Sequence, residues 1–206
     1  PYDIWYDGFK ARSGIPAEKL NDVVGKRFPS AQAYQSEIPA MLMTLGWSKE
    51  KANLFGERIK IEGARGSGHA WGAEMRNGDV ALLRARIKST GMDYKGFNIA
   101  THEFGHNVEQ TITLQDVDHY MMHGVPNTAF TEALAFVFQK RDLELLGMKE
   151  SSPNKEHLMA LDNLWACYEI MGVSLVDINL WKWLYANPNA DAAQVKEAAM
   201  RIAKEI

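Results

Sequence analysis

Three residues of the stretch HEFGH, positions 102–106, have types and spacing that could bind a metal ion and transfer a proton. Residues four apart on an α-helix project from the same face, so His102 and His106 can direct their ring nitrogens at one ion. A catalytic zinc ion usually has three protein ligands and one water molecule. Glu103 is offset by about 100° around the helix, where it can reach the water rather than the ion. The HExxH spacing therefore predicts two zinc ligands, His102 and His106, and a general base, Glu103.

The residues around this motif fit a helix that packs against a core. Ile99, Ala100, Phe104 and Val108 are apolar, and Gly105 leaves room for the close approach of another backbone. The alternative is that the two histidines hydrogen-bond to polar groups in the core and bind no metal.

A zinc site needs a third ligand. The metzincin pattern would place Gly at position 109 and His at 112, where this chain has Glu109 and Ile112, so that class is excluded. Glu132 lies near an apolar face of the next expected helix, where a divalent cation would offset the cost of burying a carboxylate. Alternatively, Glu132 is an exposed residue near a helix start, favoured by the helix dipole. Other chemically suitable ligands lie in the loop between the two helices: Asp116, Asp118, His119 and His123.

The elements that must position these residues are mainly helical. Periodicity and capping residues predict one short helix in the first 30 residues and further helices at 49–61, 94–114, 128–147, 152–172, 174–186 and 191–205. Residues 115–127 are expected to form a loop. The Asn77-Gly78 pair predicts a β-hairpin between 69–76 and 80–87. The expected fold is mainly α (α+β), with a small β-hairpin or sheet edge beside the HExxH helix.

Composition limits the other possibilities. The 206 residues, 46% hydrophobic and 24% charged, suit a single domain covering 1–206. A net charge of -3 without a basic block argues against nucleic acid and an anionic membrane as partners. No apolar run reaches the roughly 18 residues of a membrane span. Cys167 is the sole cysteine, so it forms no intramolecular disulfide, and its apolar neighbours predict a buried thiol. Compartment and oligomeric state are not indicated.

HEFGH followed by Thr-Glu-Ala on the next helix resembles the gluzincin metallopeptidases. The similarity is to the oligopeptidase and dipeptidase type, which includes thimet oligopeptidase, oligoendopeptidase F and angiotensin-converting enzyme, and it covers about residues 65–147. It implies a helical zincin-like peptidase domain that binds one Zn²⁺ per chain. It also implies that His102, His106 and Glu132 are the zinc ligands and that Glu103 is the base.

The resemblance extends to the His-Ala strand upstream. It implies that His69 and Ala70 lie along a strand on which a peptide substrate pairs by backbone hydrogen bonds, as an exposed edge strand allows. The alternative for His69 is an ordinary residue at the start of a strand.

Two features depart from the family pattern. Some gluzincins carry an acid four residues after the third ligand to orient a zinc-bound histidine; here that residue is Phe136, so we expect Glu109 or Asp142 to take this role. These enzymes also supply a Tyr or His donor from a downstream segment that this sequence does not match. We therefore expect the chain to lack a C-terminal part of the parent enzyme. Loop residues that could replace the donor are Tyr120, His119 and His123.

The sequence thus predicts a zinc-dependent peptidase that hydrolyses short peptides. The alternative is a non-catalytic zinc-binding or peptide-binding fragment of such an enzyme. In a structural zinc site, a fourth protein ligand such as His119 or His123 would replace the water.

Overall fold

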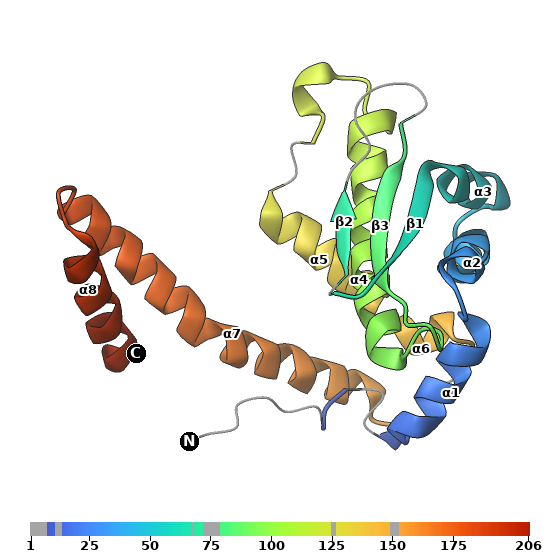
Figure 1. Ribbon diagram of the computed structural model, residues 1–206, viewed down its shortest axis with the longest axis horizontal. Helices are drawn as coiled ribbons and strands as arrows, with labels where there is room; N and C mark the ends of the chain where they lie inside the picture. Colours follow the sequence, from blue (N-terminus) through green and yellow to red (C-terminus); the bar gives the residue numbers. More distant parts are fainter. Residues whose placement is uncertain (1–7, 11–13, 67, 72–78, 125–126, 149–152) are drawn as a thin grey trace. The chain divides into compact units, whose positions relative to one another are not determined.

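The computed structural model describes residues 8–10, 14–66, 68–71, 79–124, 127–148 and 153–206. The chain divides into two compact units, one formed by Gly14–Glu150 and the other by Pro1–Ser13 with Ser151–Ile206. The first unit contains every residue proposed above as a metal ligand or general base, together with His69 and Ala70. Figure 1 shows the helices and strands of this unit.

The described residues are mainly helical, with one small mixed sheet, which confirms the α+β class. The first unit contains α1 (Ala17–Arg27), α2 (Ala31–Thr44), α3 (Lys49–Arg58), α4 (Tyr94–Thr111), α5 (Thr128–Gln139), α6 (Asp142–Leu145) and the strands β1 (Ile59–Ala64), β2 (His69–Trp71) and β3 (Ala81–Arg86). A π-helical turn (Ile112–Asp116) spans the end of the helix expected at 94–114 and the start of the loop expected at 115–127, and a 3-10 turn (Tyr120–Met122) lies within that loop. The other unit contains α7 (Lys155–Ala186) and α8 (Ala192–Glu205).

The helices that carry the site begin at side-chain caps. Asn127 accepts a hydrogen bond from the backbone N–H of Phe130 and caps α5. Asp93 accepts from the N–H of Gly96 and caps α4. These bonds satisfy backbone donors that would otherwise lack a partner in the first helical turn.

The sheet has the strand order β1-β3-β2, with β1 parallel and β2 antiparallel to the central strand. Ala81, Leu83 and Ala85 alternate as buried residues along β3, and α4 packs against this face. The antiparallel pairing of β2 with β3 agrees with the predicted hairpin, whose Asn77-Gly78 turn lies outside the described residues.

The two outer edges of the sheet differ. The side chain of Gln35 on α2 covers the edge at β1: its Oε1 accepts from the N–H of Ile61 at 2.8 Å, and its Nε2 donates to the carbonyl of Ile59 at 2.7 Å. On the other outer strand, β2, the side chain of Asn107 on α4 donates to the carbonyl of Trp71 at the end of the strand, and no side chain among the described residues hydrogen-bonds to the backbone of Ala70. The sheet therefore offers β2 as the strand to which another extended chain could add.

Several sequence-based boundaries were wrong. The helix expected to reach residue 61 ends at Arg58, because Ile59 and Ile61 pair with β3 and extend the sheet. The helix expected at 128–147 is interrupted after Gln139 and resumes at Asp142, whose side chain is held by α4.

Two expectations for the second unit were also wrong. α7 continues through Gly172 instead of ending there, since a single glycine costs a long helix only about 1 kcal/mol. Cys167 lies exposed on this helix and is not a buried thiol. Among the described residues, no helix is both long and apolar enough to cross a membrane.

The Asp93 carboxylate joins the start of α4 to the sheet. It accepts from Arg86 at 2.8 Å and from Lys88 at 2.7 Å, in addition to the Gly96 N–H. Burial by itself would raise the pKa of Asp93, but these hydrogen bonds outweigh it and lower the pKa to about 2.

Asp93→Ala should reduce the free energy of unfolding by about 1–2 kcal/mol at neutral pH, because the helix loses its cap. The folded pKa is below the unfolded value of about 3.9, so the charge stabilises the fold above about pH 4. This stabilisation is lost as the pH falls through about 2. Urea denaturation of both chains across the acid range measures the effect, with Asp22→Ala, an exposed partner of Lys26, as the control. A difference from wild type that does not shrink with acidification would contradict the role of the charge.

Candidate metal centre

Helices α4 and α5 bring the two motif histidines together with Glu132. Nε2 of His102 lies 3.3 Å from Oε2 of Glu132, and Nε2 of His106 lies 3.4 Å from Oε1. The ligand atoms of the three side chains all lie within 4.8 Å of one another. In the described part of the chain, these residues form a group that could hold a metal ion.

The two nitrogen–oxygen distances fit a shared ion better than direct hydrogen bonds. A hydrogen bond between such atoms usually brings them to about 2.7–3.2 Å. Ligand atoms placed about 2.0–2.2 Å from a tetrahedral zinc ion lie roughly 3.3–3.6 Å from one another. The separations of 3.3 and 3.4 Å, one to each oxygen of the Glu132 carboxylate, fall in the second range. Two imidazoles and one carboxylate are also the ligand set that zinc accepts in catalytic sites. The residues present therefore fit Zn²⁺.

The close approach of α4 and α5 depends on Gly105. A Cβ atom added there would lie 2.7 Å from the Cα of Ala135 and 3.2 Å from the Cβ of Phe138, closer than side chains can pack. The prediction that Gly105 admits another backbone is thus confirmed. Glu132 is one helical turn before Ala135, so this crossing sets its distance from the histidines.

The three side chains differ in their exposure. His102 and His106 are 16% and 14% exposed, whereas Glu132 is 45% exposed. Glu132 was expected near an apolar face of this helix, where its carboxylate would be buried; its side chain is instead partly exposed, because the neighbouring Phe130 and Phe136 of α5 are themselves exposed. The carboxylate nevertheless points at both imidazoles. The ring of His102 also packs edge-on against Phe136, with centroids 4.9 Å apart, which limits its rotation.

The residue predicted as the base lies next to the start of β2. A Cβ atom added to Gly68 would lie 3.0 Å from Cγ of Glu103 and 2.7 Å from Cγ2 of Ile99. The chain thus enters β2 directly against the Glu103 side chain. Asn107, one residue after the second histidine, donates to the carbonyl of Trp71 at the other end of the strand. α4 therefore holds β2 at both ends.

His69 and Ala70 lie on β2, as predicted, but their side chains occupy opposite faces of the sheet. Ala70 is paired with Leu83, on the face that packs against α4. His69 is paired with Arg84 on the exposed face, and its ring contacts Trp71 with centroids 4.3 Å apart. The His69 imidazole therefore points away from the metal-ligand group.

The alternative ligands in the connection between α4 and α5 do not join this group. Asp116 pairs with Arg58 at 2.9 Å, and a ring nitrogen of His123 contacts the carbonyl of Val117. Asp118 and His119 are exposed.

Of the acids expected to orient a histidine, neither contacts one directly. Glu109 is buried; burial raises its pKa, opposed by a hydrogen bond from Thr113 and the charge of His106. Nδ1 of His102 lies 3.1 Å from Oε1 of Gln139, a residue that sequence reasoning missed. Gln139 lies seven residues after Glu132, on the same helical face, and that spacing could have identified it.

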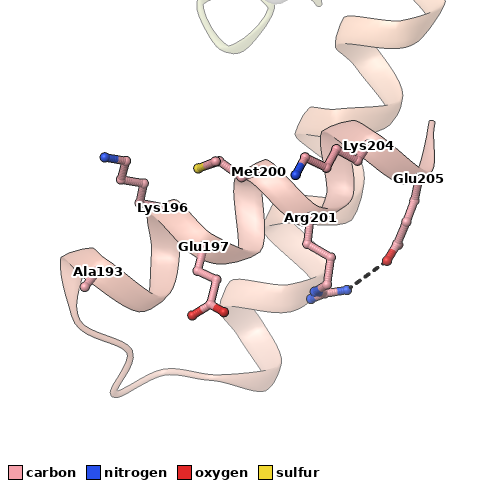
Figure 2. A pocket seen from close by; sticks show the side chains of 7 residues that line it. All are labelled: Ala193, Lys196, Glu197, Met200, Arg201, Lys204 and Glu205. Carbon is pink, nitrogen blue, oxygen red and sulfur yellow. Dashed lines mark hydrogen bonds and ion pairs between the residues drawn. The ribbon is translucent and has the colours of Figure 1, made fainter.

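The second unit has a hollow of about 550 Å³ on α8 (Figure 2). Its charged lining is mixed in sign, and Arg201 and Glu205 face each other at 3.4 Å. The lining contains no His or Cys, so it offers no comparable set of zinc ligands. The residues that line it are Ala193, Lys196, Glu197, Met200, Arg201, Lys204 and Glu205.

Glu132→Ala should weaken zinc binding by more than about 100-fold, because it removes a proposed ligand. Loss of a residue that only hydrogen-bonds to a ligand typically lowers metal affinity by about 10–100-fold. Competition titration with a zinc chelator measures the affinity. Glu57→Ala, at an exposed position on α3, is the matched control. Equal affinity in Glu132→Ala and wild type would exclude Glu132 as a ligand.

Gly105→Ala should push α5 away from α4, since the new methyl group would overlap the Ala135 backbone. We expect about 1–3 kcal/mol of destabilisation and weaker zinc binding in the same variant. Thermal unfolding and zinc titration measure the two effects. In the control Gly66→Ala, the methyl group meets no atom within 4 Å. Wild-type zinc affinity in a folded Gly105→Ala protein would show that the close crossing is not required.

Comparisons with protein-family models, curated proteins and solved structures found no match. The geometry of the metal centre is therefore the basis on which its function is interpreted.

Proposed function

We propose that the protein is a zinc-dependent peptidase of the gluzincin type, with a helical zincin-like catalytic fold, that hydrolyses short peptides. The observation that carries this proposal is the position of the Glu132 carboxylate, 3.3 and 3.4 Å from the Nε2 atoms of His102 and His106. A single Zn²⁺ per chain would be held by these three side chains. When bound, it would polarise the scissile carbonyl and lower the pKa of a water molecule toward about 7.

Glu103 supplies the proton transfers in this proposal. It neighbours the ligand His102 in sequence but projects about 100° away around the helix, so its carboxylate is free to act on water. Glu103 takes a proton from the attacking water and later gives it to the leaving nitrogen of the substrate. The position of Gly68 against Glu103 supports this role, because it brings β2, the strand to which the peptide substrate would pair, next to the proposed base.

The substrate would be an extended peptide that adds to the outer edge of β2. The amide of Gln35 covers the opposite edge of the sheet, so β2 is the strand left for pairing in the described residues. Backbone N–H and C=O groups around Ala70 would hold the peptide in register beside the metal centre. The His69 ring lies on the exposed sheet face with Trp71, and we assign it no role in catalysis.

A catalytic site is favoured over a structural one by the number of ligands. A structural zinc site has four protein ligands, whereas a catalytic site keeps one position for water. The group formed by the described residues contains three ligands. His123, which could have been a fourth, contacts a backbone carbonyl within its own loop.

Glu103→Gln should bind zinc with wild-type affinity but lose hydrolysis by about 10²–10⁴-fold, since the amide cannot accept the proton from water. Mass spectrometry of a mixed peptide library incubated with the zinc-loaded protein measures hydrolysis. Glu50→Gln, an exposed residue on α3, is the matched control.

Three outcomes separate the alternatives. Undiminished hydrolysis by Glu103→Gln would overturn the assignment of the base. Wild-type protein that binds one zinc ion but cleaves no peptide would support a non-catalytic zinc-binding or peptide-binding protein. Wild-type protein that binds no zinc would overturn the proposed function.

A further inference from the structure

A chain of hydrogen bonds links His102 to a buried carboxylate on another helix. Nδ1 of His102 lies 3.1 Å from Oε1 of Gln139, and Nε2 of Gln139 donates to Oδ1 of Asn98 at 2.7 Å. Nδ2 of Asn98 then donates to Oδ2 of Asp142 at 2.6 Å. The hydroxyl group of Tyr94 donates to the same carboxylate oxygen. We call Gln139, Asn98 and Asp142 the His102 relay.

The end of the relay fixes the direction of every bond in it. An ionised carboxylate can only accept hydrogen bonds, so Asn98 must turn its NH₂ group toward Asp142. The Asn98 oxygen then faces Gln139, and only the NH₂ group of Gln139 can donate to it. This leaves the Gln139 oxygen facing His102. An oxygen at Nδ1 requires that Nδ1 carries the proton, which leaves the lone pair on Nε2.

Asp142, at the buried end of the relay, is well suited to act as the fixed hydrogen-bond acceptor. Asp142 is 5% exposed, and its carboxylate accepts from Asn98, Tyr94 and the backbone N–H of Leu143. These donors compensate for the burial of the charge, so the acceptor is stable and fixed in place. The break between α5 and α6 is what lets Asp142 turn toward Asn98 and Tyr94 on α4.

We infer that Gln139, Asn98 and Asp142 are positioning residues that hold His102 in the Nδ1-protonated tautomer, with Nε2 ready to bind the metal ion. The inference rests on the proposed zinc site. Its distinctive feature is that a neutral amide, not a carboxylate, contacts the ligand. Gln139 therefore orients His102 without adding negative charge beside the ion. The negative charge that sets the direction of the hydrogen bonds is on Asp142, and the side chains of Asn98 and Gln139 lie between it and His102.

The second histidine provides an internal comparison. No hydrogen bond to Nδ1 of His106 is found among the described residues, so the relay acts on one ligand of the pair. A change in Gln139 should alter the tautomer of His102 and leave that of His106 unchanged.

Gln139→Met tests the relay, because methionine has a similar shape but neither the acceptor nor the donor. In metal-free protein that also carries Glu132→Ala, no carboxylate competes for a proton on Nε2 of His102, and ¹⁵N NMR of the imidazoles above the ordinary histidine pKa of about 6.5 reports the tautomers. In this background, the chain that keeps Gln139 should show His102 predominantly protonated on Nδ1, and Gln139→Met should show a mixture. In the chain that keeps Glu132, Gln139→Met alone should lower zinc affinity by about 10–100-fold. Gln32→Met, at an exposed position on α2, should change neither readout.

A conservative variant distinguishes orientation from packing. Gln139→Glu keeps an acceptor for the Nδ1 proton and should retain the wild-type tautomer of His102, even if Gln139→Met does not fold. Loss of zinc affinity in Gln139→Met without a change in the His102 tautomer would overturn the inference, as would a mixed tautomer in the Glu132→Ala chain that keeps Gln139. The expected tautomer in that chain, together with no zinc binding by the wild-type protein, would support the relay and overturn the proposed function.

Discussion

The contact between α4 and α5 at Gly105 is the constraint on which the arrangement of the candidate metal centre depends. Without a Cβ atom at this position, the Ala135 backbone approaches closely, and the carboxylate of Glu132 reaches the Nε2 atoms of both histidines. Apolar packing stabilises the crossing: the rings of Phe104 and Phe138 meet edge to face with centroids 5.6 Å apart. Burial of each ring contributes about 1.5–3 kcal/mol. The proposed ligands from two separate helices therefore keep a fixed separation.

The small sheet lies beside the same helix, on the side where the proposed peptide substrate would bind. One face packs on α4, and one edge is covered by Gln35, so β2 is left as the outer strand beside the proposed base. Asn107 is fully buried and donates to the Trp71 carbonyl, while Gly68 rests against Glu103. The helix that carries two of the proposed ligands and the proposed base is thus tied directly to the strand on which a peptide would pair in the proposed function. In Figure 1, β2 is the strand on the α5 side of the sheet.

The sequence allowed the local part of the site to be predicted, since the i, i+4 spacing of the histidines is a property of one helix. Glu132 could be proposed because three ligands were needed, although its exposure was misjudged. The role of Gln139 could not be predicted, because its contact with His102 depends on how α5 is rotated against α4. Strand β1 was missed for a similar reason: Phe55 and Ile59 fit a helical period, and only pairing with Ala81 places Ile59 in a strand.

X-ray absorption spectroscopy of the zinc-titrated wild-type protein tests the central claim most directly, because it reports the atoms that surround the ion. The account predicts one zinc ion per chain with two imidazole nitrogens at about 2.0–2.1 Å and oxygen atoms completing the coordination. A protein that retains no zinc after equilibrium dialysis, or a bound ion with no imidazole among its ligands, would contradict it.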